Sequence, residues 1–441
     1  MIDIPASESA AILVDERTTR RLESLAFVGM IFVLMLAPLL FGATEVWSQF
    51  IQRTCIALLL ALWTWQQYLQ REVLLVRNPV YVPALCFGLI GILQFLFGWT
   101  VYRHATNTEL LNLAAYGGLI LIAAETMDRR RRQISFVSAM GCFGSALAVF
   151  SILQKFSETK AIYGFREVHA ISAYFFGPYA NHNHYAGLME MLAPLAMAAG
   201  ALERGAKRYL LWFGASLMTF SIYLCGSRGG IIAAGAGIVF ACAMRYRQLP
   251  GRQTTIQIAM VILCLFALTA FLGTEKNWRR ASDLKDGQRM TIAGDTLRMS
   301  LHNPLLGFGL GTFQRAYPKY QSFSDEKLIN HAHNDYLETL ADTGILGLGI
   351  FGFLIVTVYR AGLSKMRERV DEEGQILTLA ALSGITALLV HSFFDFNLHI
   401  PANAALFFVL CSMVATPFRR RIQPEPVELM EEELIGEGER F

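Results

Sequence analysis

The sequence predicts an all-α polytopic membrane protein of about twelve transmembrane helices, and two observations lead to this fold class. First, 54% of the residues are hydrophobic and 17% are charged, whereas an ordinary soluble domain holds roughly 25% charged residues. Second, the apolar residues gather in runs that approach the roughly 20 residues a helix needs to cross a bilayer. A chain of 441 residues with so many spans leaves little for a separate soluble domain. We therefore expect one membrane domain.

The predicted spans follow one another through residues 24–416, the predicted membrane domain. They are 24–43, 50–68, 80–99, 108–127, 134–153, 184–201, 208–226, 229–244, 254–273, 336–359, 375–394 and 398–416. The connection 274–335, between the ninth and tenth spans, is too long to serve only as a connector. No cleavage site follows residues 1–23, so we expect the first span to be an uncleaved anchor.

The orientation follows from the basic residues, which are concentrated in alternate connections. The positive-inside rule makes those connections cytoplasmic, together with residues 1–23 and the acidic tail 417–441. The connections 154–183 and 274–335 then lie outside. The basic groups are Arg129 to Arg132, Arg204/Lys207/Arg208, Arg245/Arg247/Arg252, Arg360/Lys365/Arg367/Arg369 and Arg419/Arg420/Arg421.

Charge and cysteine content exclude several classes of function. The net charge of +3 gives no reason to expect a nucleic-acid partner. The seven cysteines lie almost entirely in apolar runs without CxxC spacing, so neither a disulfide framework nor a metal knuckle is expected. The glycine run 307–311 follows no strand and has GxGxG spacing, so it does not indicate a nucleotide site. We expect this run to press against the membrane domain, and we expect no cofactor.

All nine histidines lie in the predicted outer connections or at the outer ends of spans. The cytoplasmic connections, although rich in arginine, contain none, so we expect chemistry on the outer face. The histidines are His104, His169, His182, His184, His302, His331, His333, His391 and His399.

The densest polar group is the segment His331–Tyr336, which opens the tenth span. Asn334 or Asp335 is placed to cap that helix, and the positive end of the helix dipole favours a neutral imidazole at His333. A neutral histidine can act as a general base. Two alternatives stay open: a purely structural role for His333 in the loop, and a metal site built on His331/His333 or His182/His184.

Arginines supply candidate anion-binding groups on the same face. Arg228 lies in a tight outer turn at a membrane boundary, where a cation is costly to place. The long loop adds Arg280 and Arg289 among others. Two converging arginines would suit a diphosphate, whose oxygens accept forked hydrogen bonds. The alternatives are a snorkelling Arg228 and ordinary solvated charge in the loop.

Two further groups lie at the outer ends of spans. Asn181 and His184 open the sixth span, where capping accounts for one of the polar residues, and Glu190 lies deeper in the same span. Near the C-terminus a very short turn holds His391, Asp395, Asn397 and His399. For this turn, mutual hydrogen bonding is as good an interpretation as catalysis.

Over roughly residues 170–416 the motifs resemble the O-antigen ligase family, membrane glycosyltransferases related to polysaccharide polymerases and protein O-oligosaccharyltransferases. His333, Asn334, Gly344 and Gly347 match the ligase pattern of His, Asn/Ser/Gln, nine residues, Gly, two residues and Gly. The segments 181–187 (NHNHYAG), 303–307 (NPLLG) and 395–403 (DFNLHIPAN) are similar to other stretches of the family.

The resemblance implies a GT-C-like fold and a metal-independent, inverting transfer at the periplasmic face of a bacterial inner membrane. His333 would be the catalytic base, and Arg228 with Arg289, or Arg280 in its place, would hold the donor diphosphate. We place Asn334, His331, Asn181 and His184 among the substrate-binding residues.

The donor would be a glycan on polyprenyl (undecaprenyl) diphosphate, because the outer compartment supplies no nucleotide. The acceptor would be lipid A core, another glycan or a protein, in lipopolysaccharide or surface polysaccharide biosynthesis, with membrane lipids around the protein. A polymerase or a protein O-oligosaccharyltransferase would share the donor chemistry. A polytopic transporter or flippase is the alternative from another class.

Overall fold

The computed structural model describes residues 6–71, 73, 75–157, 159, 161–167, 174–248, 251, 285–323, 328–367 and 371–418. Within these residues, eight helices are long and apolar enough to cross a membrane. They are α1 (Ala6–Leu39), α2 (Val46–Gln70), α4 (Arg103–Thr126), α5 (Arg130–Phe156), α6 (His182–Leu202), α8 (Arg228–Gln248), α13 (Asp335–Arg367) and α14 (Glu372–His391). The protein is therefore a predominantly helical, polytopic membrane protein.

Three further helices lie at positions of predicted spans: α3 (Tyr81–Leu96), α7 (Ala206–Leu224) and α15 (Pro401–Ala415). α3 and α15 are apolar but shorter than the eight, and α7 is not among the eight. The predicted span 254–273 lies outside the described residues. The number twelve thus stays a prediction.

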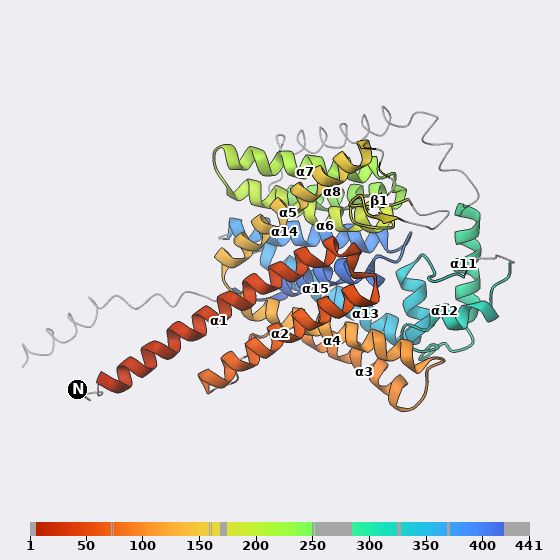
Figure 1. Ribbon diagram of the computed structural model, residues 1–441, viewed down its shortest axis with the longest axis horizontal. Helices are drawn as coiled ribbons and strands as arrows, with labels where there is room; N and C mark the ends of the chain where they lie inside the picture. Colours follow the sequence, from red (N-terminus) through yellow and green to blue (C-terminus); the bar gives the residue numbers. More distant parts are fainter. Residues whose placement is uncertain are drawn as a thin grey trace, which may run out of the picture.

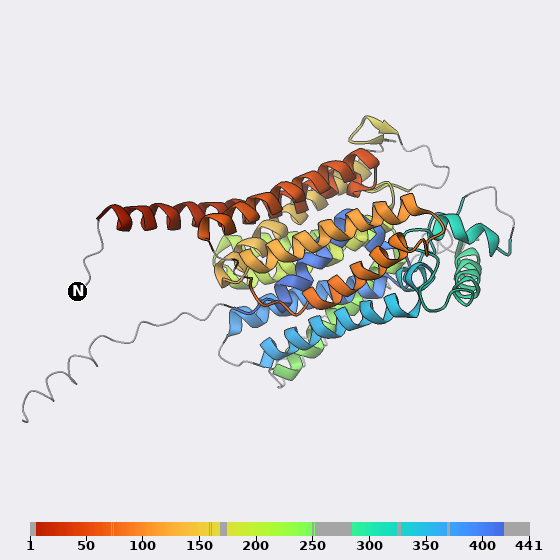
Figure 2. The ribbon, with the colours of Figure 1, turned by 90° about the horizontal axis from the view of Figure 1, so that it is seen from below.

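The helices run lengthwise beside one another as one bundle (Figures 1 and 2). α6 lies inside the bundle, where α5, α7 and α14 pack around it. Of the most apolar 18-residue stretch of α6, 78% is buried in protein, whereas the corresponding share in α8 is 17%. The sequence of α6 explains this position, because small residues such as Ala193, Ala196 and Ala199 let neighbouring helices approach closely. The lipid-facing helices instead expose large apolar side chains, among them Leu25 and Phe32 of α1.

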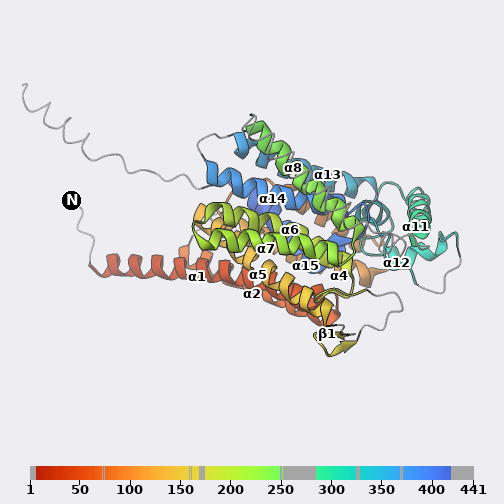
Figure 3. The same cartoon turned by 90° about the horizontal axis from the view of Figure 1, so that it is seen from above.

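A layer of short elements covers one end of the bundle, opposite the N-terminus, and we call this the outer end (Figures 1 and 3). It holds the hairpin β1 (Ala161–Ile162) and β2 (Arg166–Glu167), and the helices α11 (Lys285–Ser300), α12 (Phe313–Ala316) and η2 (Tyr317–Lys319). Part of the long connection predicted at 274–335 is therefore folded. It has an apolar core of its own, made by Ile292, Met299, Phe313, Ala316, Tyr317, Ala332 and Ala341.

The glycine run joins this layer to the bundle at a break in α13. Gly344 has φ +66°, and a Cβ on it would lie 2.2 Å from Leu305 O. The break frees two carbonyls of α13, so that Phe308 N donates to Ala341 O and Gly309 N to Asp342 O, both at 2.9 Å. The expectation that the glycine run presses against the membrane domain is confirmed.

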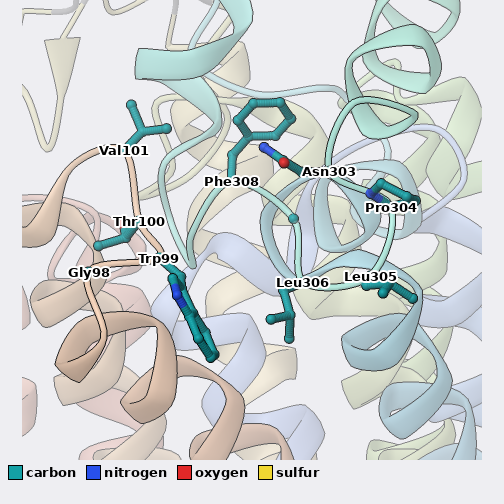
Figure 4. Close-up of a pocket in the computed structure, with 10 residues that line it drawn as sticks. Gly98, Trp99, Thr100, Val101, Asn303, Pro304, Leu305, Leu306 and Phe308 are labelled. Atoms are coloured by element: carbon teal, nitrogen blue, oxygen red, sulfur yellow. The ribbon is translucent and has the colours of Figure 1, made fainter.

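A pocket of about 560 Å³ lies beside this junction, between the α3–α4 turn (98–101) and residues 303–308 (Figure 4). Trp99 and Leu306 point the same way from the two backbone segments that form its walls. Behind it, the buried Gln94 of α3 donates to Leu306 O (2.6 Å) and accepts from Leu310 N (2.9 Å). The outer layer is thus fixed to the bundle by backbone hydrogen bonds.

Candidate functional site

Five parts of the chain meet at the outer end: the starts of α6, α8 and α13, the helix α11, and the turn 391–399 that joins α14 to α15. The eight described histidines all belong to this end of the bundle, and His169 lies outside the described residues. The turn 391–399 is the centre, because each of the other parts contacts it.

Asp395 in this turn holds the proposed base. Its Oδ1 accepts from His333 Nδ1 at 3.0 Å and from Phe396 N at 3.0 Å. Its Oδ2 accepts from Asn183 Nδ2. The Asp395 side chain is fully buried, whereas 30% of the His333 side chain is exposed. The pair therefore has a buried carboxylate and a ring that reaches the surface.

The protonation of this pair follows from its partners. Burial alone would raise the pKa of Asp395, but the His333 hydrogen bond and nearby positive charge, including Arg289, hold it well below its usual range. Asp395 is then a carboxylate, which can only accept hydrogen bonds. His333 Nδ1 must therefore be the donor, and in the neutral ring Nε2 carries the lone pair. This is the arrangement of an oriented general base.

Arg289 of α11 lies beside Asp395. Its Nη1 donates to Phe394 O at 3.1 Å and its Nη2 lies 3.8 Å from Asp395 Oδ2, while 37% of its side chain is exposed. Arg228 is the first residue of α8 and is half-buried. A Cβ on its neighbour Gly229 would lie 3.1 Å from Phe394 Cβ. Arg289 and the residue after Arg228 therefore both contact the same turn, and Arg280 lies outside the described residues.

Phe396 brings three histidines together. His331 stacks on its ring at 4.0 Å between centroids, His184 packs edge-on at 4.7 Å, and His333 lies at 5.2 Å. Phe396 was not among the predicted site residues, and its one signal in the sequence is its place in the segment 395–403. A rigid ring at this point fixes the spacing of the three imidazoles.

The side chains of Asn181 and Asn334 mainly form hydrogen bonds with backbone groups. Asn181 Oδ1 accepts from Asn183 N (2.9 Å), which caps α6, while its Nδ2 donates to His184 Nε2 (3.3 Å). Asn334 caps α13 by accepting from Leu337 N at 3.0 Å, and its Nδ2 donates to Phe393 O at 3.1 Å. Both capping predictions are confirmed. These side chains position the histidines beside them.

A second chain of charged groups lies next to the pair. His331 Nδ1 lies 2.7 Å from Glu338 Oε1, and His399 lies between Asp335 (2.8 Å) and Glu338 (3.4 Å). Burial disfavours the His399 cation, but Glu338 and Asp335 outweigh it and raise the pKa of His399 to about 10. His399 is then an imidazolium between two carboxylates at neutral pH.

The same group bears on the metal alternative. Among the described residues, His331, Glu338 and His399 are the group whose ligand atoms lie within 4.8 Å of one another and could hold a metal ion. His333 does not belong to this group, because its Nδ1 faces Asp395. Glu338 already pairs with both histidines in this group, with His331 at 2.7 Å and with His399 at 3.4 Å.

Comparison with known proteins finds one family that part of the chain resembles. Residues 213–352 match the family model described as O-antigen ligase. This segment, called the ligase segment below, is similar to the O-antigen ligase family. The resemblance deduced from the motifs is thus confirmed, and a search of curated proteins found no match to the chain. The ligase segment contains Arg228, Arg289 and His333, whereas Asp395, Phe396 and the start of α6 lie beyond it.

Outside the ligase segment, the structure also explains Glu190. This residue is buried in α6, and its Oε1 lies 2.8 Å from Nδ1 of the equally buried His391. The pair links α6 to the end of α14 one residue before Ser392, whose carbonyl accepts from Asp335 N at 2.9 Å. Glu190 and His391 thus help to fix the turn that carries Asp395. A carboxylate inside a membrane span is expected to face either a cavity or a partner, and Glu190 has a partner in His391.

Proposed function

We propose that the protein is an O-antigen ligase-like glycosyltransferase, working at the periplasmic face of a bacterial inner membrane with both termini cytoplasmic. It transfers a glycan from an undecaprenyl diphosphate donor to an acceptor hydroxyl, in lipopolysaccharide or surface polysaccharide biosynthesis. The observation that carries the proposal is the Asp395–His333 pair, in which a buried carboxylate accepts from Nδ1 of a partly exposed imidazole and lies 3.8 Å from Arg289. The ligase segment supports the broader class of reaction.

In the proposed reaction, His333 Nε2 accepts the proton of the acceptor hydroxyl. The freed oxygen attacks the anomeric carbon and forms the new glycosidic bond, with inversion. The bond from that carbon to the diphosphate oxygen breaks, and the diphosphate leaves with the electron pair. Asp395 stabilises the imidazolium that forms on His333. General-base catalysis of this kind contributes roughly 10²–10⁴ in rate.

The two arginines act on the leaving group. As the bond to the diphosphate lengthens, negative charge grows on its oxygens, and donors already in place stabilise that charge without reorganising. Arg289 is held by Phe394 O and lies 3.8 Å from Asp395 Oδ2, and the exposed part of its guanidinium would bind the ligand. Arg228 would bind from the opposite helix, α8. This use of protein cations leaves no step that requires a metal ion, so we propose a metal-independent reaction.

The test is a reconstituted assay in proteoliposomes, with undecaprenyl-diphosphate glycan and separate candidate acceptors. We expect transfer by the wild type, none by His333→Ala, and a large loss in Arg228→Ala. His302→Ala is the matched control, because His302 is an exposed histidine of the same outer layer. Transfer by His333→Ala at the wild-type rate would reject the base assignment.

The labelled acceptor identifies the subclass. Label on lipid A core indicates a ligase, label on a second lipid-linked glycan indicates a polymerase, and label on a polypeptide indicates a protein O-oligosaccharyltransferase. If folded wild-type protein transfers to none of them, glycosyl transfer is the wrong reaction. Movement of the lipid-linked glycan across the membrane would then be measured as the activity of a transporter.

A further inference from the structure

A second polar pocket lies at the outer end, between the end of α5 and the segment that leads into α6. It has a volume of about 370 Å³ and is lined by Ser151, Gln154, Lys155, Thr159, Tyr174, Phe175, Phe176 and Gly177. Ligand pockets span roughly 300–1,000 Å³. The mechanism above uses none of these residues.

Gln154 is the most informative residue of this lining. Its side chain is 8% exposed, and both its Nε2 and its Oε1 are buried without a hydrogen-bond partner among the described residues. A buried amide without partners is costly, and buried polar groups in native proteins are nearly always satisfied. An amide that offers both donors and an acceptor to a pocket matches a ligand rich in hydroxyl groups.

The other walls match the same chemistry. Lys155 is exposed, its Nζ donates to Tyr174 OH, and it lies 4.3 Å from the centre of that ring. Tyr174 and Phe175 add aromatic faces, and Ser151 and Thr159 add hydroxyls. Hydroxyls and amides recognise sugar hydroxyls, aromatic rings pack on the apolar faces of sugars, and the ammonium favours an anionic substituent.

The pocket is built on hydrogen-bonded backbone and borders the start of α6. Phe176 and Tyr179 exchange backbone hydrogen bonds of 3.1 and 3.2 Å around Gly177, which has φ +55°. A Cβ at position 177 would lie 2.2 Å from Ser151 Oγ, so only glycine allows this segment to approach α5 so closely. On its other side, Phe176 packs at 4.8 Å on Tyr185, the residue after His184.

We infer that this pocket binds a sugar unit of the saccharide substrates, and that it prefers a sugar with a carboxylate. Gln154 recognises the sugar hydroxyls and Lys155 the carboxylate. The inference rests on the proposed function for its substrate class, but its test measures binding alone.

The experiment is a ligand-observed NMR titration of the full protein in phosphatidylcholine nanodiscs, with glucuronate and glucose as probes. We expect both to bind the wild type, glucuronate roughly tenfold more tightly, since a charged partner strengthens a hydrogen bond by about one tenfold step. Gln154→Leu should weaken both at least tenfold. Lys155→Met should remove the preference for glucuronate, and because Lys155 is exposed this variant leaves the packing intact. Lys319→Met, also exposed at the outer end, is the matched control.

Each result decides the inference. It is overturned if the wild type binds neither probe, or if the two pocket variants bind like the wild type. It is also overturned if phosphatidylglycerol nanodiscs abolish the glucuronate signal, because a lipid headgroup then occupies the pocket. His333→Ala should bind both probes normally. Binding with this pattern in a protein that transfers no glycan would refute the proposed function and leave the inference standing.

Discussion

Asp395→Asn tests the proposed mechanism most directly, because it changes one atom of a buried group. The carboxylate accepts from His333 Nδ1 and Phe396 N on Oδ1 and from Asn183 Nδ2 on Oδ2, and Arg289 lies 3.8 Å from Oδ2. All of these neighbours are donors. An asparagine must therefore place its NH₂ group against donors in either orientation.

The two orientations predict two sizes of effect. If NH₂ faces His333 and Phe396 N, the ring must offer Nδ1 as an acceptor, which moves its proton to Nε2 and removes the base. The loss then reaches about 10⁴ in kcat, as in hydrolases with the wrong histidine tautomer. If NH₂ faces Asn183, that amide can rotate to accept, and the tautomer survives. Only the negative charge behind His333 is then lost, and we expect kcat to fall by a factor of about 10².

The assay is single-turnover transfer of lipid-linked glycan, with the unfolding temperature measured in parallel. We expect kcat to fall in this range with little change in KM. The fold should persist, at a cost of roughly 1–3 kcal/mol for a buried donor left unpaired. Asp371→Asn is the matched control, because Asp371 lies at the opposite end of α14, where it accepts from Gly374 N. A folded Asp395→Asn protein with a rate within tenfold of wild type would refute the reasoning.

Three further predictions concern neighbouring groups. Arg289→Lys loses the planar fork above Phe394 O, so the KM for the lipid-linked donor should rise about tenfold in the same assay; an unchanged KM would show that Arg289 does not bind the donor. Because the pKa of His399 is raised to about 10, its stabilisation is complete below the unfolded value of about 6.5 and is lost as pH rises through 10. The difference in unfolding temperature between wild type and His399→Gln should therefore be large at pH 6 and shrink toward pH 10, and a constant difference would contradict this. Gly344→Ala must adopt φ +66° and bring a Cβ within 2.2 Å of Leu305 O, so the protein should lose at least about 1–2 kcal/mol of stability, measured by chemical unfolding.

Local signals in the sequence predicted the parts of the fold that depend on local physics. Each long helix that the structure describes coincides with an apolar run in the sequence. Such helices can be predicted because the thickness of the bilayer sets the number of apolar residues that a spanning helix needs. A cap at Asn334 or Asp335, and one among the polar residues that open the sixth span, could be predicted because a cap acts within three residues; the structure assigns them to Asn334 and Asn181. The glycine run at 307–311 indicated that this loop packs closely against the membrane domain, because the lack of a Cβ is a property of the residue itself.

The contacts that the sequence did not predict join residues that are far apart along the chain. Asp395 and His333 are 62 positions apart, and Asn183 and Asp395 are 212 apart. No periodicity within either segment specifies such a partner. The sequence therefore left mutual hydrogen bonding in the turn 391–399 as an equal alternative to catalysis. The two interpretations are compatible in the structure, because the buried hydrogen bonds of Asp395 also orient His333.

The backbone of His333 shows why its segment needs the rest of the molecule. Its φ of +51° lies in the left-handed region, which costs a residue other than glycine roughly 1–2 kcal/mol. The next two residues hold it there, since Asn334 Nδ2 donates to Phe393 O (3.1 Å) and Asp335 N to Ser392 O (2.9 Å). These acceptors lie in the turn 391–399, beyond the matched residues 213–352. The ligase segment carries the proposed base, but the α14–α15 turn both holds its strained conformation and supplies its carboxylate, so the proposed mechanism requires the two parts together.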